Sequence, residues 1–412
     1  MRSRNICFAS AAACAAVLHP AAASAQEIGS TASGVFGNDR EYQPIPLRVG
    51  PFTIEVGTEA RADYTSNIYA TPDNEQGDII ARIRPYAKVT HTAGQLTTTL
   101  SSRLDVRRHA DFSSEDSEAA DVQLTTRWSP EPGQSLFLTG QVSRVIEDRG
   151  DPESRQIQVI GPRPYRILGG TAGYSRRGSR FMFEVEGDIR NIDALDPIDD
   201  DRDYETYSGR VTVGYRPGGP FYITGTGYYN RRNFRLLETG TNIDRDVSTY
   251  GGLLGISFAD GGLFEGRVGA GIFKLTADDP LRNGRTGFSL QGQLAYRPSQ
   301  RTAIKLNVFS GDVTSFRSGA STRIETRAGL AIEKEIRHNL LGSAGVEWQR
   351  YKFSGAVPQI RQERWRASGE LELLINRQMS AFGRASYSTR SSDDPLDEYS
   401  RFQAGAGVRF RF

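Results

Sequence analysis

The most constraining feature of this chain is the strict alternation of apolar and polar residues at its end. Residues 399–412 read YSRFQAGAGVRFRF, and the apolar parity carries Phe402, Ala404, Ala406, Val408, Phe410 and Phe412. Period-two alternation predicts a β-strand with one apolar and one polar face. The run is longer than the ~9–11 residues that a tilted strand needs to cross a bilayer. We therefore predict a membrane-spanning strand that closes a β-barrel at Phe412.

The same alternation begins at Phe52 and continues to the end of the chain. We count 18 strand-like segments, at 52–69, 78–92, 95–112, 119–129, 135–147, 164–176, 180–192, 202–216, 220–234, 247–259, 263–277, 285–297, 302–315, 322–336, 339–353, 361–375, 379–391 and 399–412. An even number of strands, joined alternately by short turns and longer loops, is typical of bacterial outer-membrane barrels. The predicted fold is an all-β, transmembrane, antiparallel up-and-down β-barrel over residues 52–412.

The predicted connections differ in length and composition. The tight ones, such as Ala93–Gly94 and Pro217–Gly219, contain residue types that hairpin turns require. The longer ones centre near residues 73, 115, 155, 197, 240, 280, 318, 357 and 395. We expect short turns on the periplasmic side and longer loops outside. No loop is much longer than 148–163, so we expect the loops to narrow an aqueous channel without filling it.

The first 25 residues predict a cleaved signal peptide. Its start is basic, residues 6–18 are apolar, and Ala23–Ala25 form an A-x-A site, which places cleavage after Ala25. A lipoprotein modified at Cys14 is disfavoured, because no leucine stands three residues before that cysteine. Residues 26–51 contain Gly, Ser and Pro without periodicity, and they predict an irregular periplasmic leader.

Cleavage at this site would change the composition of the mature chain. Loss of Arg2 and Arg4 lowers Lys+Arg from 51 to 49, against 49 Asp+Glu, so the formal charge falls from +2 to zero. This balance gives no reason to expect a nucleic-acid partner. Cys7 and Cys14 are also lost, which excludes disulfides and thiolate sites, and no metal or cofactor is predicted. The mean hydropathy of −0.48 fits a barrel, because polar lumen residues cancel apolar lipid-facing ones.

Parity assigns a face to each side chain within the strands. In segment 285–297, Phe288 is predicted to face lipid and Gln291 to face the lumen. The predicted lumen face is rich in cations, and the pore-lining candidates are Arg84, Lys88, Arg103, Arg107, Arg127, Arg210, Arg327, Arg366 and Arg409. Charged rings set ion selectivity in pores, and a basic lumen favours anionic solutes, including acidic sugars. The alternative is a salt-bridged wall, in which acids such as Glu370 hold the cations and nothing is selected.

Aromatic residues cluster near the predicted strand ends. They are Trp128, Tyr215, Phe221, Tyr296, Trp348, Tyr351 and Phe353. Because amphipathic rings gather at membrane interfaces, we predict that these residues form girdles.

Acidic residues concentrate in the longer loops. Asp148, Asp151 and Glu153 fall in one such loop, and residues 196–203 in another. We interpret them as solvated loop charge. The alternative is that they share bridging divalent ions with lipopolysaccharide phosphates, since hard cations take oxygen ligands.

The placement of histidines argues against an enzyme. The mature chain has only His91, His109 and His338, which the predicted strands do not bring together. His109, near Asp111 on the outer rim, is the one place where a barrel hydrolase could be built. We expect it to be an ordinary rim histidine without a catalytic role.

The opening of the barrel region resembles a known family. Residues 63–69 read DYTSNIY and residues 78–85 read DIIARIRP. These motifs resemble the opening of the "Putative β-barrel porin 2" family of proteobacteria, and the regular strands to Phe412 fit its full length. The resemblance implies a Gram-negative outer-membrane protein, and members are often associated with exopolysaccharide synthesis and export loci. The terminal strand, with Phe410 and Phe412, resembles the signal read by the barrel-assembly machinery.

We therefore predict a porin-like barrel that gives polar or anionic solutes a water-filled path across the outer membrane. The resemblance adds a link to exopolysaccharide export. The alternative is a closed structural or surface-interaction barrel that binds envelope or cell-surface sugars, and an outer-membrane hydrolase is a remote alternative. Expected partners are outer-membrane lipid and lipopolysaccharide, the barrel-assembly machinery and polysaccharide export components.

Overall fold

The structure of the protein is a computed structural model. It describes residues 42–154, 160–238, 243–258, 262–280, 282–317, 320, 322–354 and 359–412. The predicted signal peptide and leader residues 26–41 lie outside this part of the chain. The helices within it are the short 3₁₀ turns η1 (Ser113–Glu115), η2 (Pro197–Arg202) and η3 (Pro395–Asp397). None of these described helices is long and apolar enough to cross a membrane.

Strands account for most of the described residues. They are β1 (Leu47–Val49), β2 (Phe52–Thr65), β3 (Asp78–Ala93), β4 (Leu96–His109), β5 (Ser117–Trp128), β6 (Gln134–Ile146), β7 (Pro164–Arg177), β8 (Phe181–Ala194), β9 (Tyr204–Tyr215), β10 (Phe221–Phe234), β11 (Val247–Phe258), β12 (Phe264–Ala277), β13 (Arg285–Ser299), β14 (Thr302–Thr314), β15 (Thr322–Arg337), β16 (Leu340–Ser354), β17 (Arg361–Leu374), β18 (Met379–Ser392) and β19 (Tyr399–Arg411).

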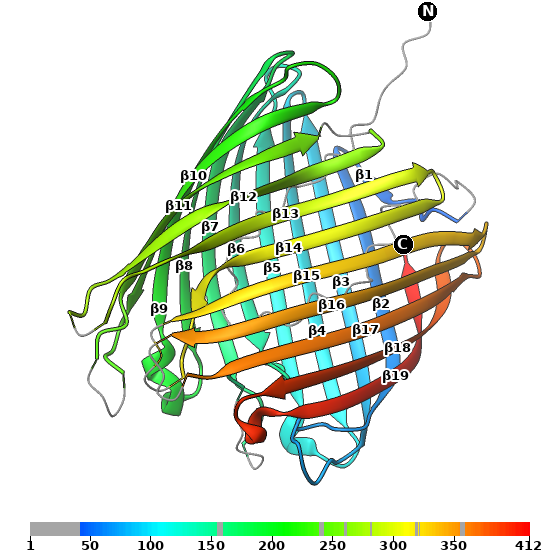
Figure 1. The fold of residues 1–412 in the computed structure, drawn as a ribbon. Coiled ribbons are helices and arrows are strands. Elements are labelled where there is room, and N and C mark those ends of the chain that lie inside the picture. Colours follow the sequence, from blue (N-terminus) through cyan, green and yellow to red (C-terminus); the bar gives the residue numbers. More distant parts are fainter. Residues whose placement is uncertain are drawn as a thin grey trace, which may run out of the picture.

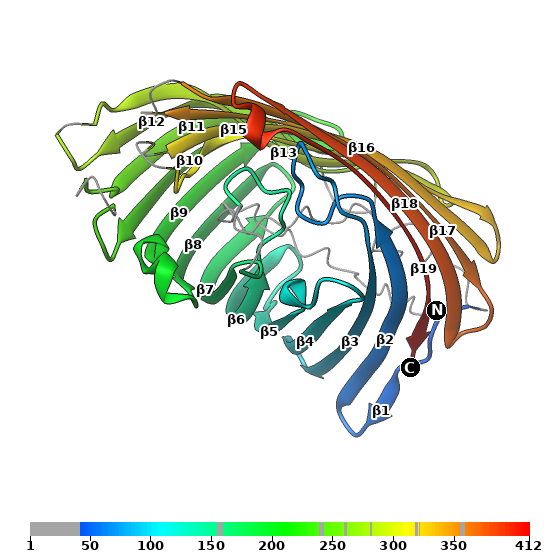
Figure 2. The same cartoon turned by 90° about the horizontal axis from the view of Figure 1, so that it is seen from below.

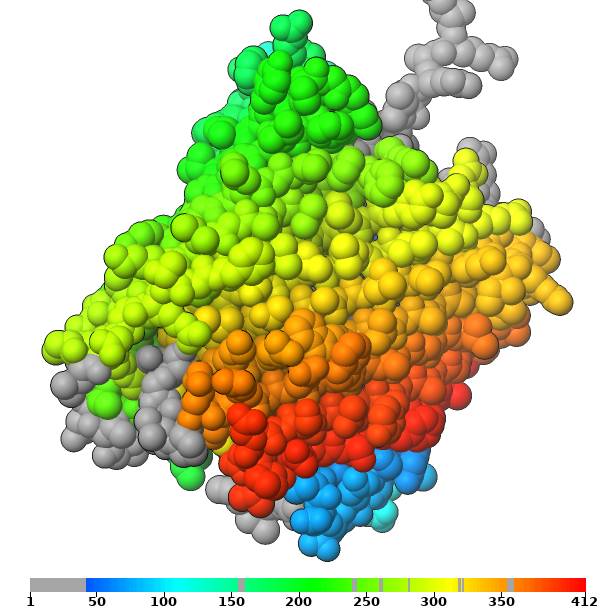
Figure 3. All heavy atoms as spheres, viewed as in Figure 1, coloured from blue at the N-terminus to red at the C-terminus, as the bar shows by residue number. Residues whose placement is uncertain are grey.

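The strands β2–β19 form a closed antiparallel barrel (Figure 1). Each strand pairs with its neighbour in the chain, and β19 pairs with β2 from Gln403↔Thr65 to Arg411↔Gly57. The predicted fold class, strand number and strand order are therefore confirmed. Figure 3 shows the side chains of the later strands, coloured green to red, forming a continuous outer wall on the face in view.

Most strand boundaries differ from the expected ones by a few residues, and two differences near the start of the barrel have a structural cause. The leader, predicted to be irregular, ends in β1, which forms a hairpin with the start of β2 through Gly50 at a φ of 58°. The first barrel strand was predicted to reach residue 69 but ends at Thr65. There the fully buried Asn67 amide donates to the carbonyl oxygens of Thr71 and Ser400, which fixes a turn in place of further pairing.

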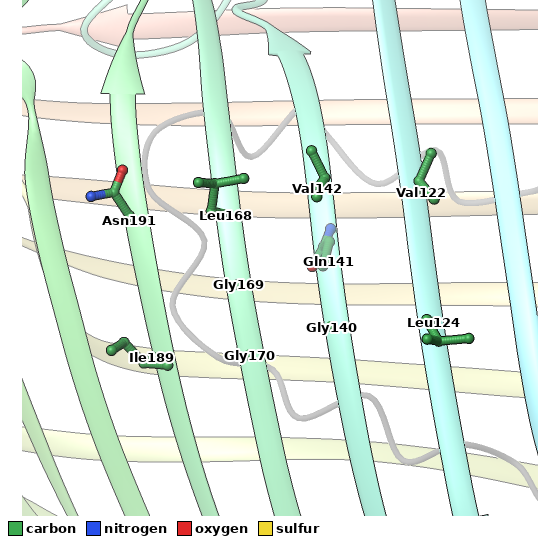
Figure 4. A pocket seen from close by; sticks show the side chains of 10 residues that line it. All are labelled: Val122, Leu124, Gly140, Gln141, Val142, Leu168, Gly169, Gly170, Ile189 and Asn191. Carbon is green, nitrogen blue, oxygen red and sulfur yellow. The ribbon is translucent and has the colours of Figure 1, made fainter.

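The outer wall is apolar, as parity predicts. Phe288 is 57% exposed on this face, whereas its neighbour Ser289 is fully buried. Glycines in β6 and β7 leave a groove of about 540 Å³ in the wall across β5–β8, shown in Figure 4. The groove is bounded by Val122, Leu124, Gly140, Gln141, Val142, Leu168, Gly169, Gly170, Ile189 and Asn191. Its position on the outer wall makes it a depression that faces lipid.

An aromatic row marks the short-turn end of the wall. Ring contacts with centroid separations of 4.9–6.3 Å join Phe181–Tyr215, Phe221–Phe258, Phe258–Phe264 and Phe264–Tyr296. This arrangement fits the predicted girdle for Tyr215, Phe221 and Tyr296. Tyr351 and Phe353 were predicted wrongly, because they are 3% and 0% exposed and belong to a buried cluster with Ala320.

The main departure from a regular barrel is at the long-loop end of β14. Pairing between β13 and β14 stops at Leu290↔Ser310, whereas pairing between β14 and β15 continues to Thr314↔Thr322. Figure 1 shows the yellow β14 curving away from β13. We call the β14–β15 segment beyond Ser310, residues 311–317, 320 and 322–324, the inserted tip.

The inserted tip packs against the lumen side of β10–β12. Asp312 forms an ion pair with Arg232 of β10, in which both side chains are nearly fully buried, and accepts a hydrogen bond from Thr249 of β11 at 3.3 Å. Ile324 packs against the buried cluster of Val247, Phe273 and Leu275. The tip therefore lies inside the barrel.

The sequence of β14 explains why the tip leaves the wall. Its lipid-facing parity carries Ile304, Leu306 and Val308, and then changes to Ser310, Asp312 and Thr314. A charged side chain on the lipid face is destabilising. Because the end of β14 turns inward, Asp312 pairs with Arg232 instead of facing lipid.

Replacement of Asp312 tests this position of the tip. Asp312→Leu should lower the free energy of unfolding by about 3–5 kcal/mol, because it leaves the buried Arg232 guanidinium without its anion. The double variant R232M/D312L should recover most of that loss, since it removes both charges. The measurement is equilibrium urea unfolding of the protein in vesicles, followed by tryptophan fluorescence.

The ion pair of Arg231, the residue next to Arg232, provides a matched control. Arg231 pairs with Asp278 at 2.6 Å, and the Asp278 side chain is 43% exposed. Asp278→Leu should therefore cost about 1 kcal/mol or less. Equal losses for Asp312→Leu and Asp278→Leu would contradict a tip that lies inside the barrel.

Candidate pore and its constriction

The lumen has two zones that differ in access to water. Towards the short turns, inner-face side chains such as Arg103 and Gln293 are exposed. Towards the long loops, inner-face side chains such as Arg323 and Arg390 are only 2% exposed. Connections that fold inward cover this second zone. Figure 2, which looks at that end, shows the coloured part of the β6–β7 connection, residues 147–154 and 160–163, lying within the ring of strands.

The first part of the β6–β7 connection, residues 147–154, crosses to another sector of the wall. The Gly150 carbonyl oxygen accepts hydrogen bonds from Arg364 of β17 at 3.3 Å and from Arg390 of β18 at 3.2 Å. The Tyr399 hydroxyl of β19 donates to the same oxygen at 3.4 Å. These donors are more than 200 residues away in sequence, so the contact is set entirely by the closed barrel.

Side chains of the same loop add two further anchors. The Asp148 carboxylate accepts from Arg401 of β19 at 3.0 Å. Arg149 donates to Glu115 of η1 at 3.0 Å and 2.5 Å, and both side chains are 4% exposed. The Arg149 guanidinium also lies 5.8 Å from the ring centroid of Tyr69. The two residues directly before Gly150 are therefore anchored to β19 and to η1.

Glu153 joins this loop to the inserted tip. Its carboxylate accepts hydrogen bonds from the Ser315 hydroxyl and, at 2.9 Å, from the Phe316 amide. Arg323 of β15 lies 3.3 Å from the same carboxylate. The ring of Phe316 contacts Tyr204 across the lumen, with centroids 6.0 Å apart. Loop and tip thus form one continuous constriction, made of polar contacts with an aromatic patch.

Burial changes the electrostatics of Asp151 in this loop. Its side chain is 3% exposed, and burial raises the pKa of the carboxyl well above its ordinary value of 3.8. The carboxylates of Asp148 and Glu147 raise this pKa further, while Arg364 and Arg323 oppose them. The docked loop therefore favours the protonated form of Asp151.

Most of the predicted pore-lining cations are held by carboxylates. Arg409 lies 2.8 Å from Glu59, 2.8 Å from Glu370 and 2.9 Å from Glu372. The other paired candidates are Arg84 with Glu59 and Asp105, Lys88 with Glu55, Arg107 with Asp105 and Arg327 with Glu325. Arg366 also has a partner. For these residues the geometry favours the salt-bridged wall that we considered as the alternative.

Three of the predicted cations have no carboxylate within salt-bridge distance among the described residues. Arg103 is exposed on β4. Arg127 of β5 donates to the Ser135 hydroxyl at 3.2 Å and lies over the ring of Phe137. Arg210 of β9 stands opposite Glu186 in the β8–β9 register without a salt bridge. These three residues are the ones able to attract a passing anion.

The histidine considered for a hydrolase has a structural partner. His109 Nδ1 lies 2.9 Å from the Asp78 carboxylate, and the Asp111 amide donates to that same carboxylate. The carboxylate beside His109 is therefore that of Asp78, in a contact between the paired strands β3 and β4. His91 packs on Phe52 at the short-turn end.

Sequence reasoning missed the constriction. Asp148, Asp151 and Glu153 were interpreted as solvated loop charge, but all three carry contacts inside the barrel, and Asp151 and Glu153 are 3% and 8% exposed. A usable signal was the concentration of inward arginines at the loop ends of the last strands, opposite an acid-rich loop. Their charges need partners that the strands alone do not supply.

Comparison with known families decides the classification. A sequence model of the family described as "Putative beta-barrel porin 2" matches residues 39–412. The chain belongs to this family. Membership places this beta-barrel porin in the outer membrane and among porin-like transport barrels, which are not enzymes. No curated protein matches its sequence.

Solved structures similar to this porin are also outer-membrane barrels. The FrpB iron transporter from Neisseria meningitidis has a TM-score of 0.46 and 7% identity, over 89% of this chain and 82% of that one. OpdK from Pseudomonas aeruginosa, solved with vanillate, has a TM-score of 0.45 and 10% identity, over 87% of this chain and 99% of OpdK. The ferric citrate transporter FecA has a TM-score of 0.45 and 13% identity over 84% of this chain, which spans 61% of FecA.

A bulky side chain at position 150 should open the constriction. A Cβ there would lie 2.8 Å from both the Arg401 Nη2 and the Tyr399 hydroxyl, so Gly150→Val displaces the loop from β19. Single-channel conductance in planar bilayers should rise roughly two-fold or more. Gly140→Val is the control, because nothing lies within 4 Å of its added Cβ. Unchanged conductance in Gly150→Val would show that the loop does not limit the path.

The raised pKa of Asp151 predicts how loop docking depends on pH. A group whose pKa is raised in the docked state stabilises docking at acidic pH, and this stabilisation is lost as the pH rises through the raised pKa. Conductance should therefore increase as the pH rises through the raised pKa of Asp151, at a pH well above the ordinary value of 3.8. Asp151→Asn, which stays neutral, should flatten this part of the profile. An increase of the same size in Asp151→Asn would assign the effect to another group.

Proposed function

We propose that the protein is an outer-membrane channel for polar solutes with a preference for anions. The observation that carries this proposal is the exposed, polar zone of the lumen, where Arg103, Arg127 and Arg210 have no carboxylate within salt-bridge distance among the described residues. In a hydrated pore, such guanidinium groups raise the local concentration of anions and lower that of cations.

The constriction supports a path that is narrowed at its outer end. It consists of residues 147–154 and the inserted tip, which are held by hydrogen bonds and ion pairs separate from the strand pairing of the wall. The loop can therefore change position while the barrel stays closed. The buried network at this end also favours the second candidate, a closed barrel that acts through its surface.

The family extends the proposal to cargo and assembly. The resemblance to proteins of exopolysaccharide loci supports acidic sugars, or export of an acidic polysaccharide, as the physiological role. In this proposal the signal peptide is removed after Ala25, and the barrel-assembly machinery reads the terminal strand with Phe410 and Phe412. Lipopolysaccharide would then surround the outer end of the barrel.

Ion selectivity tests the assignment. Reversal potentials of the refolded mature protein in a salt gradient should indicate anion preference. Each of Arg103→Gln, Arg127→Gln and Arg210→Gln should lower the chloride-to-potassium permeability ratio roughly two- to five-fold, because one unpaired lumen charge contributes about 1 kcal/mol in water. Arg144→Gln is the control, since it removes an exposed cation from the outer face of β6.

Two outcomes would decide against this proposal. A stable pore whose selectivity is the same in all four variants would remove these arginines from the conduction path. Absence of conductance from correctly folded protein, including Gly150→Val, would favour the closed barrel.

A further inference from the structure

Three arginines lie side by side beneath the constriction. Arg364 of β17 and Arg390 of β18 are direct partners in the strand register, and Arg401 follows on β19. Their exposed fractions are 5%, 2% and 8%. Adjacent guanidinium groups repel each other, so this arrangement requires negative groups in front of them.

The carboxylates in front of these arginines match only some of the guanidinium N–H donors. A guanidinium has five N–H donors, and a carboxylate matches two of them in a bidentate contact. Here Asp148 contacts Arg401 at 3.0 Å, and Glu347 lies 3.8 Å from Arg364. Within the described part of the chain, the hydrogen bonds of Arg390 go to the backbone carbonyl oxygens of Gly150, Asp151 and Asp397.

Several buried donors of the cluster have no hydrogen-bond partner among the residues that the structure describes. They are Arg364 Nε, Arg390 Nη2 and Arg401 Nε. These atoms belong to side chains that are more than nine-tenths buried. The cluster therefore has unused capacity to bind an acceptor-rich group.

An aromatic ring completes the site. Tyr399 lies under two of the guanidinium groups, at 4.8 Å from Arg390 and 5.7 Å from Arg401. Its hydroxyl donates to Gly150, as do Arg364 and Arg390. The loop thus presents a carboxylate and a carbonyl to a pocket of arginines and a tyrosine.

We propose that Arg364, Arg390 and Arg401, with Tyr399, form a binding site for a carboxylate-bearing, hydroxyl-rich solute such as a sugar acid. Asp148 and Gly150 occupy this site as an internal substitute for the ligand. The ligand binds by displacing the loop, so binding and opening of the constriction are coupled. This inference rests on the proposed channel function and names its solute class.

The charge around the site favours a carboxylate over a phosphate. Displacement of Asp148 removes one negative charge from the arginines, and a monocarboxylate replaces it one for one. A phosphate dianion would add a further charge close to Glu347, which already lies beside Arg364. Carboxylate geometry also matches the planar fork of arginine.

Titration calorimetry of the detergent-solubilised mature protein tests the site directly. The probe is glucuronate, with glucose as the uncharged analogue and inorganic phosphate as the competing anion. Arg390→Gln and Arg364→Gln should each weaken glucuronate binding about ten-fold or more, because each loses a charged hydrogen bond. Arg350→Gln is the control, because that arginine is exposed on the outer face of β16.

A second variant should have the opposite effect on the affinity for glucuronate. Gly150→Val displaces the internal substitute and keeps all three arginines in the chain, so it should tighten glucuronate binding. A folding defect cannot produce this gain. Unchanged or weaker binding in Gly150→Val would overturn the displacement model, and unchanged binding in Arg390→Gln would overturn the site. Phosphate or glucose binding as tight as glucuronate would overturn the carboxylate assignment.

Failure of this inference is distinguishable from failure of the channel proposal. Conduction of chloride without glucuronate binding would support the channel and contradict the binding site. Glucuronate binding with the predicted variant pattern, but without conductance, would support the binding site and contradict the channel.

Discussion

Closure of the sheet between β2 and β19 is the constraint on which the rest of the structure depends. Lipid offers no hydrogen-bond partners, so each unpaired backbone group of an open edge would cost several kcal/mol. The β2–β19 register removes that edge. Closure also separates each strand into a lipid side and a water side, so Phe288 and Gln291 lie in different solvents although they are three residues apart. The charged residues then have to share the lumen, and most of them neutralise one another there. Arg409 with its three carboxylate neighbours is the clearest case.

The same constraint accounts for the inserted tip. Where β14 turns inward, β13 loses its neighbour over residues 285–289, at the end of the wall nearest the long loops. The exposed edge is a cost, and it is offset inside the barrel by the Asp312–Arg232 ion pair and by the contact of Ile324 with the Val247 cluster. Satisfaction of a buried charge therefore outweighs a few ladder hydrogen bonds, and the sector lined by β10–β12 is filled by the chain itself.

Features that depend on local periodicity were predictable from the sequence, and features that depend on distant partners were not. Strand number, order and face follow from period two, because each residue's side is set by its immediate neighbours. The position of Gly150 depends on three donors more than 200 residues away, and no local pattern near residue 150 encodes them. The inserted tip is intermediate. Asp312 breaks the apolar parity of β14, and this break could have indicated an exit from the wall, but not that Arg232 would be the partner. Pairing of the lumen arginines likewise required the cross-strand register, which separated Arg103, Arg127 and Arg210 from the others.

The wall, the tip and the loop are held by different interactions, and this difference determines which of them can move. The wall is held by continuous backbone ladders in lipid, and it cannot open without exposing them. The tip is held by a fully buried ion pair and by apolar packing, so its release would leave a charge unpaired in the interior. The loop around Gly150 is held by hydrogen bonds from Arg364 and Arg390 to a carbonyl oxygen, and by the ion pairs of Asp148 with Arg401 and of Arg149 with Glu115. Hydrogen bonds of this kind contribute about 1–3 kcal/mol each relative to alternative partners. In the binding model proposed above, the solute replaces the contacts of Asp148 and Gly150, so the loop is the element of the three at which a solute would control the path through the lumen.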